Sequence, residues 1–351
     1  MTVVATAALR PGYDISRIII GGWQLAGGHG PVDQAAAVDN LVAFSQAGLH
    51  TFDCADIYTG VEELLGTARA EVGRRHGAAA RARIKVHTKC VPDLDALRDV
   101  DRAYIRRNVE TSLKRLRTER LDLVQFHWWD YAIPRAIEAA GWLAELQREG
   151  KIDRLGGTNF DTPHTAYLVS AGIDLVSMQV QYSLLDNRPE HALVDFCREK
   201  NVRLLCYGTV AGGFLSDRWL GVAEPRQPLE NRSLTKYKLI IDDFGGWALF
   251  QDLLRLLRKI ADRHGTDIAS VASRVMLDRP GVAAVIVGAR NRAHLATNVA
   301  MTALALTDTD NAEIGKVLAR RQGPAGDTFA LERDRNGRHG SIMKYNLNQV
   351  A

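Results

Sequence analysis

The chain has 351 residues, of which 46% are hydrophobic and 25% are charged. This composition allows a large core and excludes a wholly disordered chain. The 45 basic and 41 acidic residues leave a net charge of only +4. Apart from one predicted helix the basic residues are scattered, so the sequence predicts no nucleic-acid partner.

Cysteine usage and hydropathy predict a cytoplasmic protein. The four cysteines, at positions 54, 90, 197 and 206, show no Cys-x-x-Cys spacing. This is typical of a reducing compartment and predicts neither a disulfide framework nor a zinc site. The N-terminus lacks a basic-then-apolar signal sequence, and no run of about 18 apolar residues could span a bilayer. We therefore expect no metal and no membrane partner.

The predicted elements alternate between strands and helices. The turn signal Arg10-Pro11-Gly12 predicts a hairpin within residues 1–16. The β-branched run Ile18-Ile19-Ile20 predicts a buried parallel strand, and a helix follows from about Asp33. Pro134 is predicted to lie in the first turn of a later helix. Further strands are predicted to end at Asp53, Lys89, His127, Gly157, Gln179 and Tyr207, with an eighth over residues 283–287, and helices are predicted at about 61–75, 101–117, 134–150, 162–171 and 190–200.

Eight alternations without a linker or a change of composition favour one fold. They predict an α/β protein with a closed (β/α)8 TIM barrel rather than a doubly wound sheet. We therefore expect a single domain over residues 1–351, with an N-terminal hairpin and with residues 319–351 as a C-terminal extension.

One connection is much longer than the others, since 75 residues separate Tyr207 from Ala283. Its first part, residues 208–246, shows no clear periodicity and is predicted to be a long loop over the carboxyl-end face of the barrel. Long loops in compact domains are usually functional. Helices are predicted over about 247–263 and 266–278.

Polar residues close three successive strands. Asp53, followed by Tyr58, ends the second strand, Lys89 ends the third and His127 ends the fourth. Singly, each has a simpler interpretation: a helix cap, a packed ring, a surface charge or a core histidine. Together they should meet at the carboxyl-end face, where α/β barrels place their chemistry. We therefore predict a catalytic site there.

This order of Asp, Tyr, Lys and His resembles the tetrad of the aldo-keto reductases. The resemblance covers roughly residues 10 to 305, and six similar stretches occur in the family's order. They are Gly21 to Gln24, Asp53 to Tyr58 with Glu62 to Gly66 behind it, Leu121 to Trp128, Gly157 to Phe160, Gln179 to Leu185, and Val285 to Arg290. The resemblance implies a barrel closed below by a hairpin, and a reductase of aldehydes or ketones.

The four predicted catalytic residues can act together. A tyrosine phenol, with a pKa of about 10, is a poor acid near neutrality. The ammonium of Lys89 would lower the pKa of Tyr58, and Asp53 would hold that ammonium in place. His127 could orient a carbonyl oxygen beside the Tyr58 hydroxyl, so that a proton reaches oxygen as a hydride reaches carbon. A cofactor would carry the hydride.

The sequence has no Gly-x-Gly-x-x-Gly after its first strand, which argues against a Rossmann domain. The resemblance instead implies NADPH, with NADH as an alternative, extended across the barrel mouth. By position, Thr158, Asn159 and Gln179 match the carboxamide contacts, Tyr207 the ring that stacks on nicotinamide, and Asp53 and Trp23 further cofactor contacts.

Two further segments match cofactor positions in the family. The loop matching the pyrophosphate site consists of Gly208, Thr209, Val210, Ala211 and Gly212. The adenosine-phosphate segment contains Gly288, Ala289, Arg290, His294 and Asn298. Arg290 is predicted to bind a 2′-phosphate. His294 stands where a longer arginine or glutamine is common, so NADPH is preferred but the strength of that preference stays open.

The substrate is predicted only as a class, a small carbonyl compound. The predicted pocket consists of Trp23, Tyr58, Trp128 and Trp129, and Tyr131, Phe214 and Trp219 are further aromatic candidates. Such walls suit sugars, steroids and aryl aldehydes alike. The sequence also leaves a homo-oligomer open.

Two other functions compete with a reductase. The channel-associated β subunits of the same family bind the cofactor but act as regulatory subunits, and turnover of a simple aldehyde would distinguish them. A barrel hydrolase or isomerase without nicotinamide is disfavoured by the Thr158, Asn159, Gln179 and Tyr207 set.

The C-terminal extension is predicted to be ordered. It has a charged run from Glu332 to Arg335, after which apolar residues return at Ile342, Met343 and Tyr345. We expect these three to pack on the barrel or on a partner subunit, with the charged run forming ion pairs.

Overall fold

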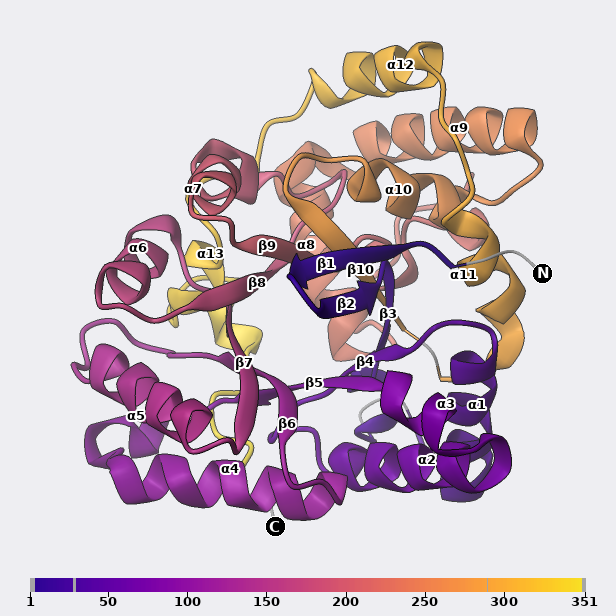
Figure 1. Ribbon diagram of the computed structural model, residues 1–351. Helices are drawn as coiled ribbons and strands as arrows, with labels where there is room; N and C mark the ends of the chain where they lie inside the picture. The colour runs from indigo at the N-terminus through magenta and orange to yellow at the C-terminus, as the bar shows by residue number, and fades with distance from the viewer. Residues whose placement is uncertain (1–3, 28–29, 289, 349–351) are drawn as a thin grey trace.

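The computed structural model describes residues 4–27, 30–288 and 290–348. Eight parallel strands close into a barrel in the order β10-β3-β4-β5-β6-β7-β8-β9, with helices around it (Figure 1). The predicted (β/α)8 fold is therefore confirmed. The strands are β3 (Ile18–Gly21), β4 (Thr51–Asp53), β5 (Lys85–Cys90), β6 (Leu121–Phe126), β7 (Ile152–Thr158), β8 (Leu175–Gln181), β9 (Arg203–Tyr207) and β10 (Val282–Gly288).

Three of the helices that surround the barrel, α1, α4 and α6, begin at aspartate caps. Asp33, Asp101 and Asp161 each accept a hydrogen bond from a backbone N–H in the first turn, as preferred N-cap residues do. No helix of the described part of the chain is long and apolar enough to cross a membrane. The helices of the barrel are α1 (Gln34–Gln46), α2 (Val61–His76), α3 (Ala78–Arg83), α4 (Arg102–Leu116), α5 (Ala136–Arg148), α6 (Thr162–Ser170), α7 (Leu193–Glu199), α9 (Gly246–His264), α10 (Ile268–Leu277), α11 (Leu295–Met301) and α12 (Asp308–Leu318).

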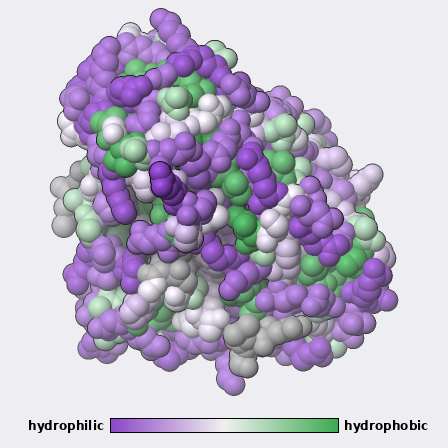
Figure 2. All heavy atoms as spheres, turned by 180° about the vertical axis from the view of Figure 1, so that it is seen from behind, coloured by the Kyte–Doolittle hydropathy of each residue, from purple (hydrophilic) through white to green (hydrophobic). Residues whose placement is uncertain are grey.

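An N-terminal hairpin closes the amino-end face of the barrel, as predicted. Strands β1 (Thr6–Arg10) and β2 (Tyr13–Ser16) pair antiparallel and lie across the centre of the barrel in Figure 1. Leu9, Tyr13 and Ile15 are 1% exposed and pack against apolar residues inside the barrel. The opposite face is the carboxyl-end face, and Figure 2 shows it as a largely hydrophilic surface with apolar residues in its hollows.

The segment 208–246 differs from the predicted long loop, because it contains helix α8 (Arg232–Phe244). Asn231 caps this helix, and Leu234, Ile241 and Phe244 are buried at helical spacing. Helix α8 lies over the barrel mouth. Its apolar stripe was obscured in the sequence by the irregular stretch before it, which is rich in glycine and proline.

The helix after β6 also begins later than predicted. Helix α5 starts at Ala136, after Arg135 with a φ of 87°. Pro134 therefore precedes the helix instead of lying in its first turn. A residue before proline avoids the helical conformation, but proline itself is compatible with either position.

The C-terminal extension folds back over the mouth, as Figure 1 shows for helix α13 (Ala330–Arg333). Glu332 is 1% exposed, and its two oxygens accept hydrogen bonds from Arg188 at 2.8 and 3.0 Å. Met343 and Tyr345 pack against the core, and His339 pairs with Asp243 at 2.7 Å. Met343 and Tyr345 thus pack as predicted, whereas Ile342 is not among the residues that pack on the core.

Two buried side chains inside the barrel, His87 and Tyr13, carry polar atoms that have no hydrogen-bond partner among the described residues. His87 is fully buried, and neither of its ring nitrogens has a hydrogen-bond partner among the described residues. Its ring lies 6.2 Å from that of Tyr13, whose hydroxyl is equally unpaired in the described structure. Burial lowers the pKa of His87 to about 3, helped by Lys89 and Lys85. The ring is therefore neutral in the folded protein.

We predict that His87→Leu stabilises the protein, increasingly so in acid. Below about pH 6.5 the unfolded chain protonates this histidine and the folded protein does not, so wild-type stability falls as pH drops. The variant should gain ~1.4 kcal/mol relative to wild type per pH unit between about 6 and 4. Urea unfolding at several pH values measures this difference. The control is His76→Leu at an exposed position, and a pH-independent difference for His87→Leu would contradict the prediction.

We predict that Glu332→Gln loosens the C-terminal segment. Burial alone would raise the pKa of Glu332, but Arg188 brings it down to about 2, so this ion pair is present at neutral pH. Removing one partner of a buried pair costs roughly 3–5 kcal/mol. A lower melting temperature and faster trypsin cleavage near Arg335 and Arg338 are expected. Glu119→Gln, at an exposed position, serves as control. If trypsin cleaves the C-terminal segment of the Glu332 variant no faster than that of the wild type, the Glu332–Arg188 pair does not hold the segment in place.

Candidate active site

Four strands bring a buried ion pair and two amides together at the mouth. Lys89 Nζ donates to Asp53 Oδ2 at 2.7 Å. Asp53 Oδ1 accepts from Gln125 Nε2 at 3.0 Å and from Gln179 Nε2 at 2.6 Å. All four residues are at most 5% exposed. The sequence analysis missed Gln125, although it lies two residues before His127 and therefore on the same face of β6.

Two opposing effects act on the pKa of Tyr58, and the larger one is not the ammonium on which the sequence analysis relied. Lys89 also donates to the Cys54 carbonyl at 2.7 Å, and its Nζ lies 5.2 Å from the centre of the Tyr58 ring. Burial raises the pKa of Tyr58 to about 12, and Lys89 opposes that shift. Lysine thus acts in the predicted direction, but burial outweighs it. Burial likewise disfavours the ammonium, yet Asp53 keeps the pKa of Lys89 above its usual value.

The loop that carries Tyr58 is held from two sides. Asp56 accepts hydrogen bonds from Val91 N–H at 2.9 Å and from Asn108 Nδ2 at 2.7 Å. On the other side, the Trp23 ring lies 5.0 Å from the Tyr58 ring. Gly22, the residue before Trp23, has no room for a side chain, because a Cβ there would lie 2.6 Å from a Val61 methyl group. The predicted residues Trp23 and Tyr58 therefore face one another.

His127 presents a lone pair to the mouth. Its Nδ1 lies 2.9 Å from the carbonyl oxygen of Thr158. Because a carbonyl can only accept, the Nδ1 atom carries the proton, and Nε2 is an acceptor in the neutral ring. Burial lowers the pKa of His127 to about 3, and the charge of Arg333 adds to this. Nε2 has no partner among the described residues, so it can accept a hydrogen bond but cannot donate one to a carbonyl oxygen.

The C-terminal segment places Phe329 and Arg333 near His127, a role that the sequence analysis did not predict for either residue. The Phe329 ring lies 5.7 Å from the His127 ring, and Trp129 lies 4.4 Å from it, edge-on. Arg333 donates to the carbonyl oxygens of Trp129 at 2.5 Å and Asn159 at 2.8 Å. The charged run had suggested only ion pairs, whereas Arg333 binds backbone carbonyls at strand ends.

The predicted pocket residue Trp128 is placed apart from the others. It is fully buried, its indole donates to the Ile133 carbonyl at 2.9 Å, and its ring packs against Phe126. Trp129, one residue later, takes the opposite direction towards His127. The two consecutive indoles, just after the end of β6, therefore lie on different sides of the chain, and only that of Trp129 is next to His127.

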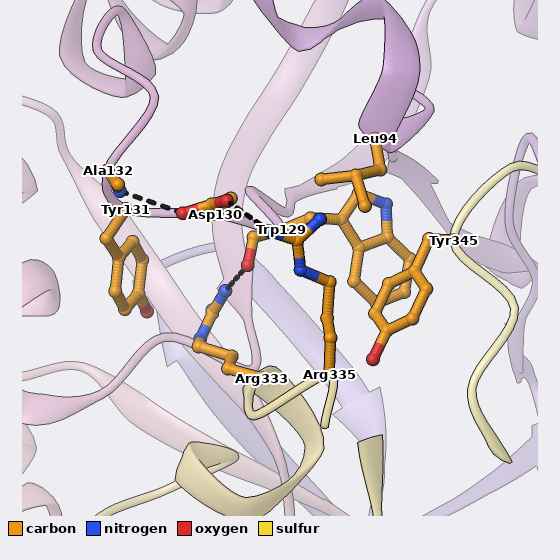
Figure 3. A pocket seen from close by; sticks show the side chains of 8 residues that line it. All are labelled: Leu94, Trp129, Asp130, Tyr131, Ala132, Arg333, Arg335 and Tyr345. Atoms are coloured by element: carbon orange, nitrogen blue, oxygen red, sulfur yellow. Dashed lines mark hydrogen bonds and ion pairs between the residues drawn. The ribbon is translucent and has the colours of Figure 1, made fainter. Parts of the chain in front are cut away.

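A groove of about 250 Å³ opens on the outer side of Trp129 (Figure 3). In it the Tyr345 ring lies 5.1 Å from the Trp129 ring, and Arg335 reaches to within 3.5 Å of Asp130. Because Trp129 stands between this groove and His127, the groove borders the site without reaching the tetrad. Its lining consists of Leu94, Trp129, Asp130, Tyr131, Ala132, Arg333, Arg335 and Tyr345.

Gln179 and Asn159, which are predicted to bind the carboxamide, each keep one amide atom that could bind it. Gln179 spends its Nε2 on Asp53 and Gln125, which leaves its oxygen as acceptor. Asn159 accepts from the Tyr207 hydroxyl at 2.8 Å, which leaves its Nδ2 as donor. The buried Thr158 hydroxyl has no partner in the described structure. One acceptor and one donor suit a primary carboxamide, so these residues fit a nicotinamide.

The predicted pyrophosphate loop lies under helix α8. A Cβ on Gly208 would come within 2.4 Å of the Tyr237 hydroxyl, and one on Gly212 within 2.7 Å of its ring, so both positions require glycine. Thr209 instead bonds Ser273 at 3.1 Å, which turns its hydroxyl to helix α10. Of the remaining loop residues, Ala211 is fully buried and Val210 is half-buried.

The predicted adenosine-phosphate residues lie after β10. Gly288 ends that strand, and Arg290 Nη2 donates to the Pro31 carbonyl at 3.1 Å. His294 is exposed and Asn298 is 8% exposed. Ala289 lies outside the described residues. Helix α11, which follows, begins at Leu295 and has seven residues.

The residues described by the structure contain no cluster of three or more metal-ligating side chains. In the described chain the four cysteines are buried and unbridged. The site is therefore built from one ion pair, a phenol, a neutral imidazole and amide groups.

Comparison with known proteins identifies the family. The profile described as "Aldo/keto reductase family" matches residues 17–319. The aldo-keto reductase YhdN of Bacillus subtilis (strain 168) is 28% identical over 92% of this chain and 96% of its own, and the NADH-specific methylglyoxal reductase of Escherichia coli (strain K12) is 25% identical over 84% and 92%. The structure of glycerol dehydrogenase AKR11B4 from Gluconobacter oxydans superposes with a TM-score of 0.76, at 23% identity, over 93% of this chain and 98% of that one. The chain belongs to the aldo/keto reductase family and is an NAD(P)H-dependent oxidoreductase.

Proposed function

We propose that this protein reduces an aldehyde or ketone to an alcohol, with NADPH as hydride donor and Tyr58 as proton donor, and that the reaction is reversible. The observation that carries this proposal is the buried Lys89–Asp53 pair beneath the Tyr58 ring. A buried ion pair is costly unless the site uses its charge.

The proposed proton path follows from the hydrogen-bond donors and acceptors of the site. Bound NAD(P)H would supply the hydride. The Tyr58 hydroxyl donates to the carbonyl oxygen; as the alcohol forms, its O–H bond breaks and the new alcohol O–H bond forms. The Lys89 ammonium stabilises the phenolate left behind, while Asp53 keeps the ammonium charged. His127 Nε2, an acceptor, binds the hydroxyl of the alcohol instead of the carbonyl.

The residues that would hold the cofactor run across the mouth. Gln179, Asn159 and Thr158 would bind the carboxamide, and Tyr207 would stack on its ring. The loop from Gly208 to Gly212 would carry the pyrophosphate. Arg290 is proposed to bind a 2′-phosphate, which favours NADPH. A carbonyl substrate would enter between Trp23, Tyr58 and Trp129. The four buried thiols support a cytoplasmic location.

Tyr58→Phe is expected to abolish turnover without weakening the binding of the cofactor. The change removes one hydroxyl and keeps the ring that packs on Trp23, and a positioned general acid is worth roughly 10²- to 10⁴-fold in rate. Steady-state reduction of a simple aldehyde at 340 nm and NADPH fluorescence titration provide the two measurements. Tyr167→Phe, at a tyrosine that is 57% exposed, is the control. More than about a tenth of wild-type kcat in the Tyr58 variant would remove the acid assignment.

Arg290→Ala is expected to weaken NADPH selectively. A charge-assisted hydrogen bond contributes roughly 1.5–3 kcal/mol, or about ten- to a hundredfold in Kd. NADH lacks the 2′-phosphate, so its Kd should change little. Arg292→Ala is the matched control, because Arg292 is held by Asn40 at 2.9 Å. Parallel losses for both cofactors in the Arg290 variant would instead assign Arg290 a structural role.

A further inference from the structure

Helix α8 turns one face towards the barrel mouth, and its residues contact two different parts of the site. Tyr237 covers Gly208 and Gly212 of the proposed pyrophosphate loop. Lys236, its neighbour, instead reaches the C-terminal segment: its Nζ lies 5.7 Å from the centre of the Phe329 ring and 5.2 Å from that of Tyr207. Phe329 in turn contacts His127. Lys236 is therefore on the side of the mouth where a substrate would lie.

The ammonium of Lys236 has little to bind within the described structure. Its side chain is only 17% exposed, and its one carboxylate neighbour, Glu332 Oε1, is 4.0 Å away. Both oxygens of Glu332 are already occupied by Arg188. No hydrogen bond from Nζ to a described residue is formed, and the aromatic rings of Tyr207, Tyr237 and Phe329 surround it. A charge so placed is costly unless an oxygen ligand completes it.

A second cation lies on the same ring. The Arg333 guanidinium carbon is 5.6 Å from the centre of Phe329. Its two Nη atoms donate to backbone carbonyls, and no described carboxylate forms an ion pair with it. Lys236 and Arg333 thus place two positive charges around the Phe329 ring, and Glu332, the carboxylate next to Lys236, is already paired with Arg188. Positive charge gathered in this way favours an anion.

We propose that Lys236 anchors a carboxylate carried by the carbonyl substrate, so that the protein prefers aldehydo or keto acids to neutral carbonyl compounds. This inference rests on the proposed reductase function and names its substrate class. The substrate carboxylate would receive the unused ammonium donors, while its carbonyl lies beside Tyr58 and His127. Arg333, whose Nη atoms are held by backbone carbonyls, contributes its positive charge and no direct contact.

The test compares two aldehydes that differ in one charge, 4-formylbenzoate and its methyl ester. For Lys236→Met we expect kcat/KM for the acid to fall about ten- to a hundredfold, mostly through KM, because a charge-assisted hydrogen bond is lost. The ester should change less than about threefold, and Lys236→Arg should recover much of the activity with the acid. Lys259→Met, at a lysine with a 67% exposed side chain, is the matched control.

The outcomes separate this inference from the function on which it rests. Equal losses for acid and ester, or a weaker NADPH Kd in Lys236→Met, would overturn the anchor, since the first indicates a structural role and the second a cofactor contact. Terephthalate is also titrated calorimetrically into the enzyme saturated with NADP⁺. Binding that Lys236→Met weakens at least tenfold supports the anchor even if neither aldehyde is reduced, a result that would count against the reductase alone. No binding to the wild-type enzyme would overturn the anchor.

Discussion

The rest of the site depends on the buried ion pair between Lys89 and Asp53. Two charges removed from water are tolerated only when every donor and acceptor around them is matched. Gln125, Gln179 and the Cys54 carbonyl provide that match. These groups come from β4, β5, β6 and β8, so the requirement fixes the register of strands across half the barrel. Tyr58 can then rest above a cation that is held in place.

The same burial determines how protons can move at the mouth. It raises the pKa of Tyr58 and lowers that of His127, so both groups are neutral before reaction. His127 Nδ1 donates a hydrogen bond to the carbonyl oxygen of Thr158, so His127 Nε2 can only accept, whereas the Tyr58 hydroxyl can donate. The positive charge of Arg333 opposes a second proton on the imidazole. The proposed reaction therefore assigns the two residues different tasks at one substrate oxygen.

Helix α8 and the C-terminal segment together shape the barrel mouth. Phe329 contacts His127, and the ammonium of Lys236 lies near the same phenyl ring. The Glu332–Arg188 pair joins the C-terminal segment to the barrel. Removing one partner of this buried pair would leave an uncompensated charge in the interior. The proposed substrate recognition by Lys236 would therefore depend on the same contacts that stabilise the segment.

The sequence by itself determined the barrel and the residues at its strand ends. Strand periodicity and the spacing of Asp53, Lys89 and His127 are local features, and parallel strands carry such residues to one face whatever the helices do. Tertiary structure alone decided the rest. Gln125 contacts Asp53, Phe329 contacts His127 and Lys236 lies near Phe329, and each of these pairs is separated by at least 70 positions. The apolar stripe of helix α8 was hidden by the irregular stretch before it. The acceptor role of His127 Nε2 was equally invisible, because the tautomer depends on a carbonyl of the next strand. Hydrogen bonds between distant segments leave no periodic trace in a sequence.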